Sequence, residues 1–215
     1  MKKLSHINTW IFDLDNTLYS PSCKLFDQIA VRMTDFIVAR FQVSPAEAAR
    51  LRHTYFKKYG TTLRGLMLEH GMEPHAFLDY VHDINYAPVP AHPELIAAIG
   101  RLPGRKIIFT AGTKAHAANV LAQLGGVESF ECVFDIVDAS FIPKPDARPY
   151  EIFLKRHDVV AESAAFVEDL AENLLVPRAL GMSTILVGPH DAALLPAHVD
   201  YVTDDLAEFL NGVIP

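Results

Sequence analysis

Apolar residues form one short continuous run near the start of the chain and then change to a helical spacing. Residues 8–14 (NTWIFDL) are rich in aromatic and β-branched side chains, which is typical of a buried strand. From residue 21 to residue 86 the apolar positions follow only the helical period. Ser44-Pro45-Ala46-Glu47 is a capping box with proline at the first helical position. The pattern predicts helices over residues 24–41, 44–59 and 73–82.

After a proline-containing stretch at residues 87–90, short apolar runs alternate with amphipathic segments. This alternation predicts an α/β fold, a doubly wound parallel sheet with helices on both faces. Because the first strand precedes the helical block, the block is an insertion into the sheet domain. We therefore expect an α/β core formed by residues 1–20 and 87–215, with a helical cap at residues 21–86. The expected strands are 106–110, 135–137, 164–167, 183–187 and 201–202, and the expected helices are 93–102, 113–124, 146–156 and 171–180.

Composition and charge restrict the class of partner. Half of the 215 residues are apolar, 21% are charged and the formal net charge is -7, so a nucleic acid polymer would be repelled on average. Cys23 and Cys132 give neither a disulfide framework nor a metal-binding spacing, as in a reducing compartment. The basic start is followed by an apolar run too short for a signal peptide, and no segment reaches transmembrane length. We expect a cytoplasmic monomer or homodimer that acts on a small molecule, without a nucleic acid or membrane partner.

Polar and charged side chains that could take part in catalysis or ligand binding follow four separate predicted strands. Ligands of open α/β sheets bind beyond the carboxyl ends of the strands, so these side chains are expected at one edge. Two carboxylates about 4 Å apart repel by roughly 4 kcal/mol at an effective dielectric near 20, so a group of them needs a cation or raised pKa values. The residues are, in chain order, Asp13 and Asp15, then Thr110 and Ala111, then Lys144, then Glu168 and Asp169.

Each of these segments taken alone has an ordinary structural explanation. Asp13-Leu14-Asp15 is compatible with a polar turn after a strand, and Thr110 with a hydroxyl bonded to backbone. Lys144 is compatible with a solvated loop, and Asp169 with Glu172 is compatible with a capping box. The combination of all four in one chain favours a functional site over these separate explanations.

The ordered set resembles the four motifs of the haloacid dehalogenase (HAD) superfamily of phosphohydrolases and spans the whole chain. Within it the chain is similar to the pyrimidine 5'-nucleotidase-like group. That similarity lies in DLDNTLY, Tyr59-Gly-Thr-Thr-Leu-Arg-Gly, His82-Asp83, Leu102-Pro-Gly-Arg-Lys and Phe134-Asp135-Ile136. The chain departs from the group at Ala111, where asparagine is usual, and at Leu170, where serine is common.

The resemblance implies a Rossmann-like HAD core with an inserted helical cap and a set of residue roles. Asp13 is the implied nucleophile, and Asp15 the group that protonates the leaving oxygen and then activates water. Mg²⁺ is the implied cofactor, because it prefers oxygen ligands and supplies charge between a carboxylate and a phosphate. The implied metal ligands are Asp13, the backbone carbonyl of Asp15, Asp169 and Glu168. The implied phosphate-binding groups are Thr110, the amide of Ala111 and Lys144.

The cap is expected to close over the sheet edge and to bind the leaving group. The candidate residues for that role are Tyr19, Tyr59, Thr61, Thr62, Arg64 and His82. An alternative explanation for Tyr59 and Arg64 is that they only join the cap to the core. The ten histidines show no paired metal-binding spacing, so none is assigned as a ligand.

The sequence therefore predicts a magnesium-dependent phosphomonoester hydrolase with a small phosphorylated metabolite as its partner. A nucleoside 5'-monophosphate is the preferred substrate, and a pyrimidine nucleotide is the leading candidate. Alternatives are a sugar phosphate or phosphoglycolate phosphatase, a phosphomutase, or a non-catalytic binding protein with the HAD fold. A dehalogenase would need neither magnesium nor Asp15, so the presence of Asp15 argues against it.

Overall fold

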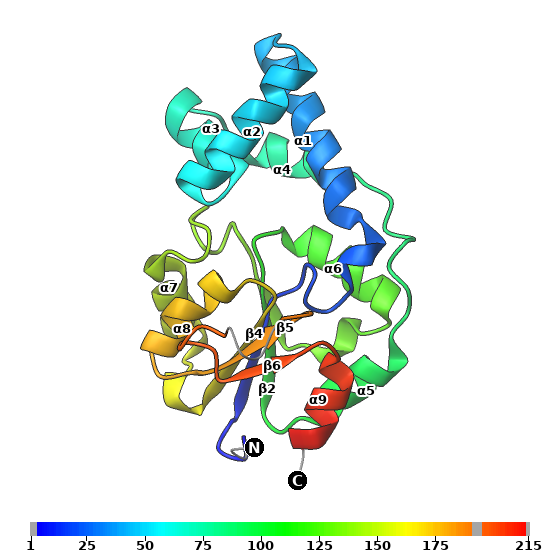
Figure 1. The fold of residues 1–215 in the computed structure, drawn as a ribbon, viewed down its shortest axis with the longest axis vertical. Coiled ribbons are helices and arrows are strands. Elements are labelled where there is room, and N and C mark those ends of the chain that lie inside the picture. The colour runs from blue at the N-terminus through cyan, green and yellow to red at the C-terminus, as the bar shows by residue number, and fades with distance from the viewer. Residues whose placement is uncertain (1–3, 191–194, 214–215) are drawn as a thin grey trace.

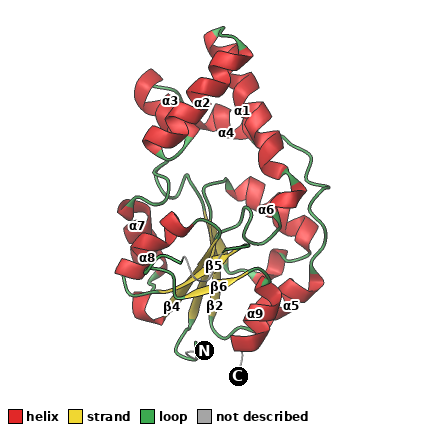
Figure 2. Cartoon of the chain, in the orientation of Figure 1, coloured by secondary structure: helices red, strands yellow, loops and turns green. Residues whose placement is uncertain are grey.

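The core of the molecule is a six-stranded sheet in which every strand pair is parallel. The computed structural model describes residues 4–190 and 195–213. The order across the sheet is β3-β2-β1-β4-β5-β6, so the first strand lies in the middle. Figure 2 shows the strands, in yellow, at the centre of the core with helices on both sides. The strands are β1 (Thr9–Phe12), β2 (Arg105–Phe109), β3 (Cys132–Phe134), β4 (Ala164–Glu168), β5 (Ser183–Val187) and β6 (Tyr201–Thr203). The predicted doubly wound parallel sheet is confirmed.

Helices cover both faces of the sheet. Successive side chains of a strand point to opposite faces, and because they are apolar in the central strands, both faces must be buried. Trp10 and Phe12 belong to a buried cluster with side chains of α5 (Pro93–Arg101), α6 (Lys114–Leu124) and α9 (Leu206–Val213). Ile11, between them in β1, belongs to a second cluster with α7 (Ala147–His157) and the start of α8 (Leu175–Ala179). Figure 1 shows the two groups of helices on opposite sides of the strands.

Four helices stand apart from the sheet at one end of the molecule (Figure 1). They are α1 (Leu25–Phe41), α2 (Pro45–Tyr59), α3 (Thr62–His70) and α4 (Pro74–Val81), and they follow β1 in the chain. Ile37, Leu66 and Phe77 are buried in an apolar cluster of their own. Ser44 accepts the N–H of Glu47 at 3.2 Å, as the capping box predicts. We propose that residues 21–86 form the cap, and residues 1–20 and 87–215 the α/β core.

Several elements differ from the sequence prediction. The strand predicted at residues 135–137 lies earlier, at Cys132–Phe134, because the Asp135 carboxylate accepts backbone N–H groups of Lys114, Val137 and Asp138 and folds that segment into a turn. The helix predicted over 171–180 is a 3₁₀ turn followed by α8. Pro177 has no N–H to donate, so it is tolerated only in the first turn of a helix. Helices α3 and α9 were not predicted separately.

The sheet order brings the ends of β1 and β4 together. The chain moves from β1 to β2 and β3 on one side and then crosses to β4 on the other side of β1. Ligands of such sheets bind at this reversal of strand order. Phe12 pairs with Val167, so Asp13 and Glu168 follow the same register position. Among the described residues, no helix is both long enough and apolar enough to cross a membrane.

We predict that truncation of the sheet-facing side of α6 destabilises the protein strongly. Leu121 is 3% exposed in the cluster around Trp10, whereas Leu68 on α3 is 56% exposed. Leu121→Ala leaves a cavity and should lower the free energy of unfolding by about 2–5 kcal/mol. Leu68→Ala, the matched control, should change it by less than about 0.5 kcal/mol. Urea denaturation followed by circular dichroism measures both values, and equal losses would contradict the assigned burial.

Candidate active site

A buried ion-pair network lies at the carboxyl end of β1. Asp13 follows the strand directly, and its backbone N–H donates to the carbonyl of Val167 at 2.9 Å. Lys144 Nζ donates to Asp13 Oδ1 at 2.7 Å, to Glu168 Oε2 at 2.6 Å and to the Phe109 carbonyl at 3.2 Å. All three charged side chains are buried. Residues from β1, β4 and the loop that follows β3 therefore meet at one point.

Burial and like charge together perturb the two carboxyl groups of this network. Burial, then the nearby Glu168 carboxylate, raises the pKa of Asp13 to about 7, against the opposing effect of Lys144. Burial also raises the pKa of Glu168 to about 7, again against Lys144. Burial disfavours the charged form of Lys144, but Asp13 and Glu168 outweigh it and raise the pKa of its ammonium group. The lysine stays charged and is shared by two acids.

Asp169 completes a group of acids that can hold a metal ion. Carboxylate oxygens of Asp13, Glu168 and Asp169 lie within 4.8 Å of one another. Glu168 is already engaged, since Oε1 accepts the N–H groups of Asp169 and Leu170 and Oε2 accepts Lys144. Burial raises the pKa of Asp169. Its side chain caps no helix, because the following 3₁₀ turn begins after Leu170 without a side-chain cap. An all-oxygen donor set of this kind fits Mg²⁺.

Asp15 lies beside this group in a separate hydrogen-bond network. Its Oδ1 accepts Tyr19 Oη–H at 2.6 Å and lies 2.7 Å from His116 Nε2. Burial disfavours the charged carboxylate, but His116, followed by Tyr19, outweighs burial and lowers the pKa of Asp15. His116 is fully buried, and its Nδ1 lies 3.0 Å from Tyr86 Oη. The network keeps Asp15 ionised and fixes one of its two oxygens.

His116 is a site residue that the sequence did not reveal. It lies on α6 and stacks on His82, with ring centroids 4.6 Å apart. Burial, then His116, lowers the pKa of His82 to about 4. A lone histidine on an amphipathic helix carries no signal of its own, and its partner Asp15 is 101 positions away in the chain. Of the two rings, only His82 was a candidate from sequence.

Thr110 and Ala111 follow β2 directly, after the Phe109 carbonyl that accepts Lys144. Thr110 is buried, and its Oγ1 accepts the N–H of Gly112 at 2.9 Å. Ala111 is exposed and lines a cavity together with Asp15 and Gly112. The turn thus presents backbone at the point where the core faces the cap.

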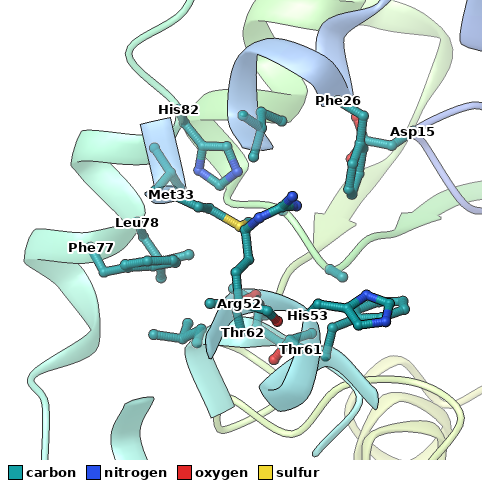
Figure 3. Close-up of a pocket in the computed structure, with 17 residues that line it drawn as sticks. Asp15, Phe26, Met33, Arg52, His53, Thr61, Thr62, Phe77, Leu78 and His82 are labelled. Atoms are coloured by element: carbon teal, nitrogen blue, oxygen red, sulfur yellow. Dashed lines mark hydrogen bonds between the residues drawn. The ribbon is translucent and has the colours of Figure 1, made fainter. Parts of the chain in front are cut away.

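The cavity of about 160 Å³ extends from Asp15 into the cap (Figure 3). Three predicted cap residues, Thr61, Thr62 and His82, line it. Arg52 and His53 are the other polar cap residues that line it, and the sequence did not reveal them. In the sequence of α2 they are indistinguishable from the basic residues of an ordinary solvent-exposed helix face. The apolar wall consists of Phe26, Ile29, Met33, Phe56, Leu63, Phe77, Leu78, Val81 and Ile136.

The remaining predicted cap residues lie elsewhere. Tyr19 belongs to the core side and binds Asp15. Tyr59 and Arg64 line a second cavity of about 450 Å³, formed with the loop around Lys144. The Tyr59 hydroxyl donates to Glu69. Neither Tyr59 nor Arg64 lines the cavity that contains Asp15.

A model of the haloacid dehalogenase-like hydrolases matches residues 7–181. The chain belongs to this hydrolase family. It is 24% identical over 194 residues to phosphate metabolism protein 8 of Saccharomyces cerevisiae, a match that covers 82% of this chain. The chain spans 60% of the length of that yeast protein.

Solved structures of HAD-like hydrolases share the fold. A HAD phosphatase from Thermococcus onnurineus superposes with a TM-score of 0.65 at 16% identity, covering 96% of this chain and 98% of that one. A 2-haloacid dehalogenase from Pseudomonas syringae pv. Tomato gives 0.61 at 20% identity, covering 96% and 97%. Both similarities concern the fold of the hydrolase, since phosphatases and dehalogenases share it.

We predict a specific pH dependence for the metal-free hydrolase. The pKa values of Asp13 and Glu168 are raised to about 7 in the folded state, from ordinary values of 3.8 and 4.5. Between these values and pH 7, the folded state therefore keeps protons on these acids that the unfolded state has released. The stability from these groups is therefore present at low pH and is lost as pH rises to about 7. Wild type should lose stability relative to Glu168→Gln over this range.

Urea denaturation at a series of pH values, with a chelator present, measures this difference. Glu168→Gln removes one acid and also the repulsion that raises the pKa of Asp13, so its profile should be shallower. Parallel profiles of wild type and Glu168→Gln would contradict the assigned pKa shifts.

Proposed function

We propose that this hydrolase is a magnesium-dependent phosphomonoesterase that uses Asp13 as its nucleophile. The supporting observation is the convergence of Asp13, Lys144, Glu168 and Asp169 at the end of β1, next to Asp15. The proposed substrate is a small phosphorylated metabolite, and the leading candidate is a pyrimidine nucleoside 5'-monophosphate. The motifs shared with the pyrimidine 5'-nucleotidase-like group support this choice.

In the first step, a carboxylate oxygen of Asp13 attacks phosphorus and the bond from phosphorus to the leaving oxygen breaks. The products are a phospho-aspartate and the free alcohol, which takes its proton from Asp15. A bound phosphate is a like charge near Asp15 and favours protonation of that carboxyl. Asp15 Oδ2 has no hydrogen-bond partner among the described residues, so it is available for this transfer.

In the second step, water attacks the phospho-aspartate and Asp15, now ionised, accepts its proton. Inorganic phosphate leaves and Asp13 returns to its carboxylate form. The lowered pKa of Asp15 in the free protein favours the ionised form that this step requires. His116 and Tyr19 hold Oδ1 throughout, so that Oδ2 alone exchanges protons.

Positive charge around the phosphoryl group comes from Lys144, and a bound metal ion would add to it. Lys144 reduces repulsion between Asp13 and an incoming anion, while Thr110 and the Ala111 amide donate to phosphoryl oxygens. Mg²⁺ held by Asp13, Asp169 and the Asp15 carbonyl, with Glu168 beside them, would supply further charge to those oxygens. Glu168 Oε2 bonds Lys144, so we assign Glu168 mainly to placing the lysine.

A dehalogenase is the competing activity within the same fold, since structural neighbours include 2-haloacid dehalogenases. Release of a halide needs no proton donor, whereas release of an alkoxide does. The Asp15–His116–Tyr86 network supplies a placed proton-transfer group and supports the phosphatase. Ala111 lacks the side-chain amide usual in the nucleotidase group, so its backbone N–H carries the contact.

We predict that phosphate release from cytidine 5'-monophosphate requires both Asp13 and magnesium. Asp13→Asn keeps the size of the side chain but removes the nucleophile, so kcat should fall by at least about 10³-fold. Removal of magnesium with a chelator should abolish turnover, and addition of magnesium should restore it. A colorimetric phosphate assay measures both effects, with ribose 5-phosphate and phosphoglycolate as comparison substrates. Undiminished turnover by Asp13→Asn would contradict the mechanism.

We predict that His116 acts on turnover through Asp15. His116→Ala removes the donor to Oδ1, and loss of a hydrogen bond to a charged group corresponds to a kcat decrease of about 10–100-fold. His116→Gln retains an N–H donor and should recover most of the rate. The KM should stay within about threefold in both variants, because His116 does not line the cap cavity.

Steady-state kinetics, with thermal melting of each variant as a control, distinguishes this role from simple packing. Equal loss in His116→Ala and His116→Gln, in proportion to loss of stability, would show that the residue only supports the fold.

A further inference from the structure

Arg52 carries a guanidinium group without a partner inside the cap cavity. It lies on α2, and its side chain points into the space between His82 and Phe26 (Figure 3). Its Nε is buried and has no hydrogen-bond partner. In the described part of the chain, residues 4–190 and 195–213, no carboxylate pairs with this guanidinium. Arg52 as a whole is half-buried, and its Nε–H donor is left without an acceptor in the free protein.

Six other arginines among the described residues are paired with acids, whereas Arg40, Arg64 and Arg101 have no acidic partner there and do not line this cavity. Arg50, two residues earlier on the same helix, binds Glu47 in solvent at 2.5 Å and 2.8 Å. The further pairs are Arg32–Asp83, Arg105–Glu131, Arg148–Asp146, Arg156–Asp138 and Arg178–Asp200. Arg52 differs from these because its surroundings are the apolar wall of the cavity. An arginine stays charged in proteins, so the positive charge of Arg52 remains beside the cavity at every ordinary pH.

A ligand is the natural partner for such a group. A buried N–H donor is costly unless it is hydrogen-bonded, and a planar guanidinium pairs best with two acceptor atoms in one plane. The apolar walls around it accommodate a flat or short carbon framework. Phe26 and Phe56, which are 47% and 53% exposed, line the same cavity and remain open to contact.

The position of the cavity connects Arg52 to the proposed chemistry. The cavity begins at Asp15 and at the Ala111–Gly112 turn and continues between the cap helices. A phosphomonoester with its leaving oxygen at Asp15 therefore directs the rest of the leaving group towards Arg52. The volume of about 160 Å³ is close to that of a cavity that admits benzene, so it suits a single ring or a short chain.

We propose that Arg52 determines substrate specificity by binding a planar pair of acceptor atoms on the leaving group. The pyrimidine edge of a cytosine ring (O2 and N3) and a carboxylate both present such a pair. This inference rests on the proposed phosphatase function and narrows it. The substrate class is phosphomonoesters whose leaving group carries one of these two acceptor groups near a small apolar framework.

The test compares substrates that do and do not carry the acceptor pair. Cytidine 5'-monophosphate supplies the ring edge, phosphoglycolate supplies the carboxylate, and phenyl phosphate supplies neither. Arg52→Met removes the charge and keeps the length of the side chain. It should lower kcat/KM for the preferred acceptor substrate by about 30-fold, mainly through KM, and leave phenyl phosphate within about threefold. The substrate that suffers the loss identifies which acceptor the site binds.

Two further variants control for charge and folding. Arg50→Met changes the same helix on its solvent side, so it should leave all three substrates unaffected. Arg52→Lys keeps the charge but lacks the planar fork, so it should give an intermediate loss on the acceptor substrate alone. If Arg52→Met fails to fold, as judged by thermal melting, Arg52→Lys decides the question by the same comparison.

Binding separates this inference from the proposed function. Calorimetric titration of Asp13→Asn with cytidine 5'-monophosphate or phosphoglycolate needs no turnover, and the added Arg52→Met change should weaken binding by about 30-fold. If no substrate is hydrolysed but this binding difference is present, the phosphatase proposal fails and the ligand class stands. Equal loss on phenyl phosphate, no loss on any substrate, or binding unaffected by Arg52→Met would overturn the role of Arg52.

Discussion

The ammonium group of Lys144, shared between two buried acids, is the interaction on which the site depends. Asp13 and Glu168 lie at the carboxyl ends of neighbouring strands, and both are almost fully buried. Two such acids without a cation would repel each other and would favour the neutral forms. The lysine offsets that repulsion, and it arrives on a loop that belongs to neither strand. Three distant parts of the chain are thus held together by one charge.

The parallel sheet makes that meeting possible. The β1 and β4 strands are adjacent and in a register that brings residues 13 and 168 to the same edge. A shift of one residue in either strand would turn one acid towards a helix layer. The apolar clusters on both faces fix the register, because Trp10, Ile11 and Phe12 are all fully packed on alternate sides. The chemistry of the edge and the packing of the core therefore impose the same alignment.

Sequence pattern predicted the parts of the molecule that are governed by local rules. Helix α2 begins at its capping box, and Asp13 follows β1 as the periodicity indicates; Glu168 is the last residue of β4, one position beyond the predicted end of that strand. It did not predict features set by contacts between distant segments. His116 is recognisable only through Asp15, and Arg52 only through the cavity that four helices enclose. The β3 strand was displaced because Asp135 bonds three backbone N–H groups, a choice that composition does not reveal.

The loop between β3 and α7 joins the cap and the core mechanically. Ile136 and Phe141 from this loop pack into the apolar cluster of the cap, and Lys144 follows three residues after Phe141. Pro143 lies against Gly60 at the end of α2, where a Cβ atom would approach its ring to 3.0 Å. A tilt of the cap is therefore transmitted to the lysine that balances the two acids. Remodelling of the cap for a new leaving group is thereby restricted, since the segment that holds the cap in place also sets the charge at the reaction centre.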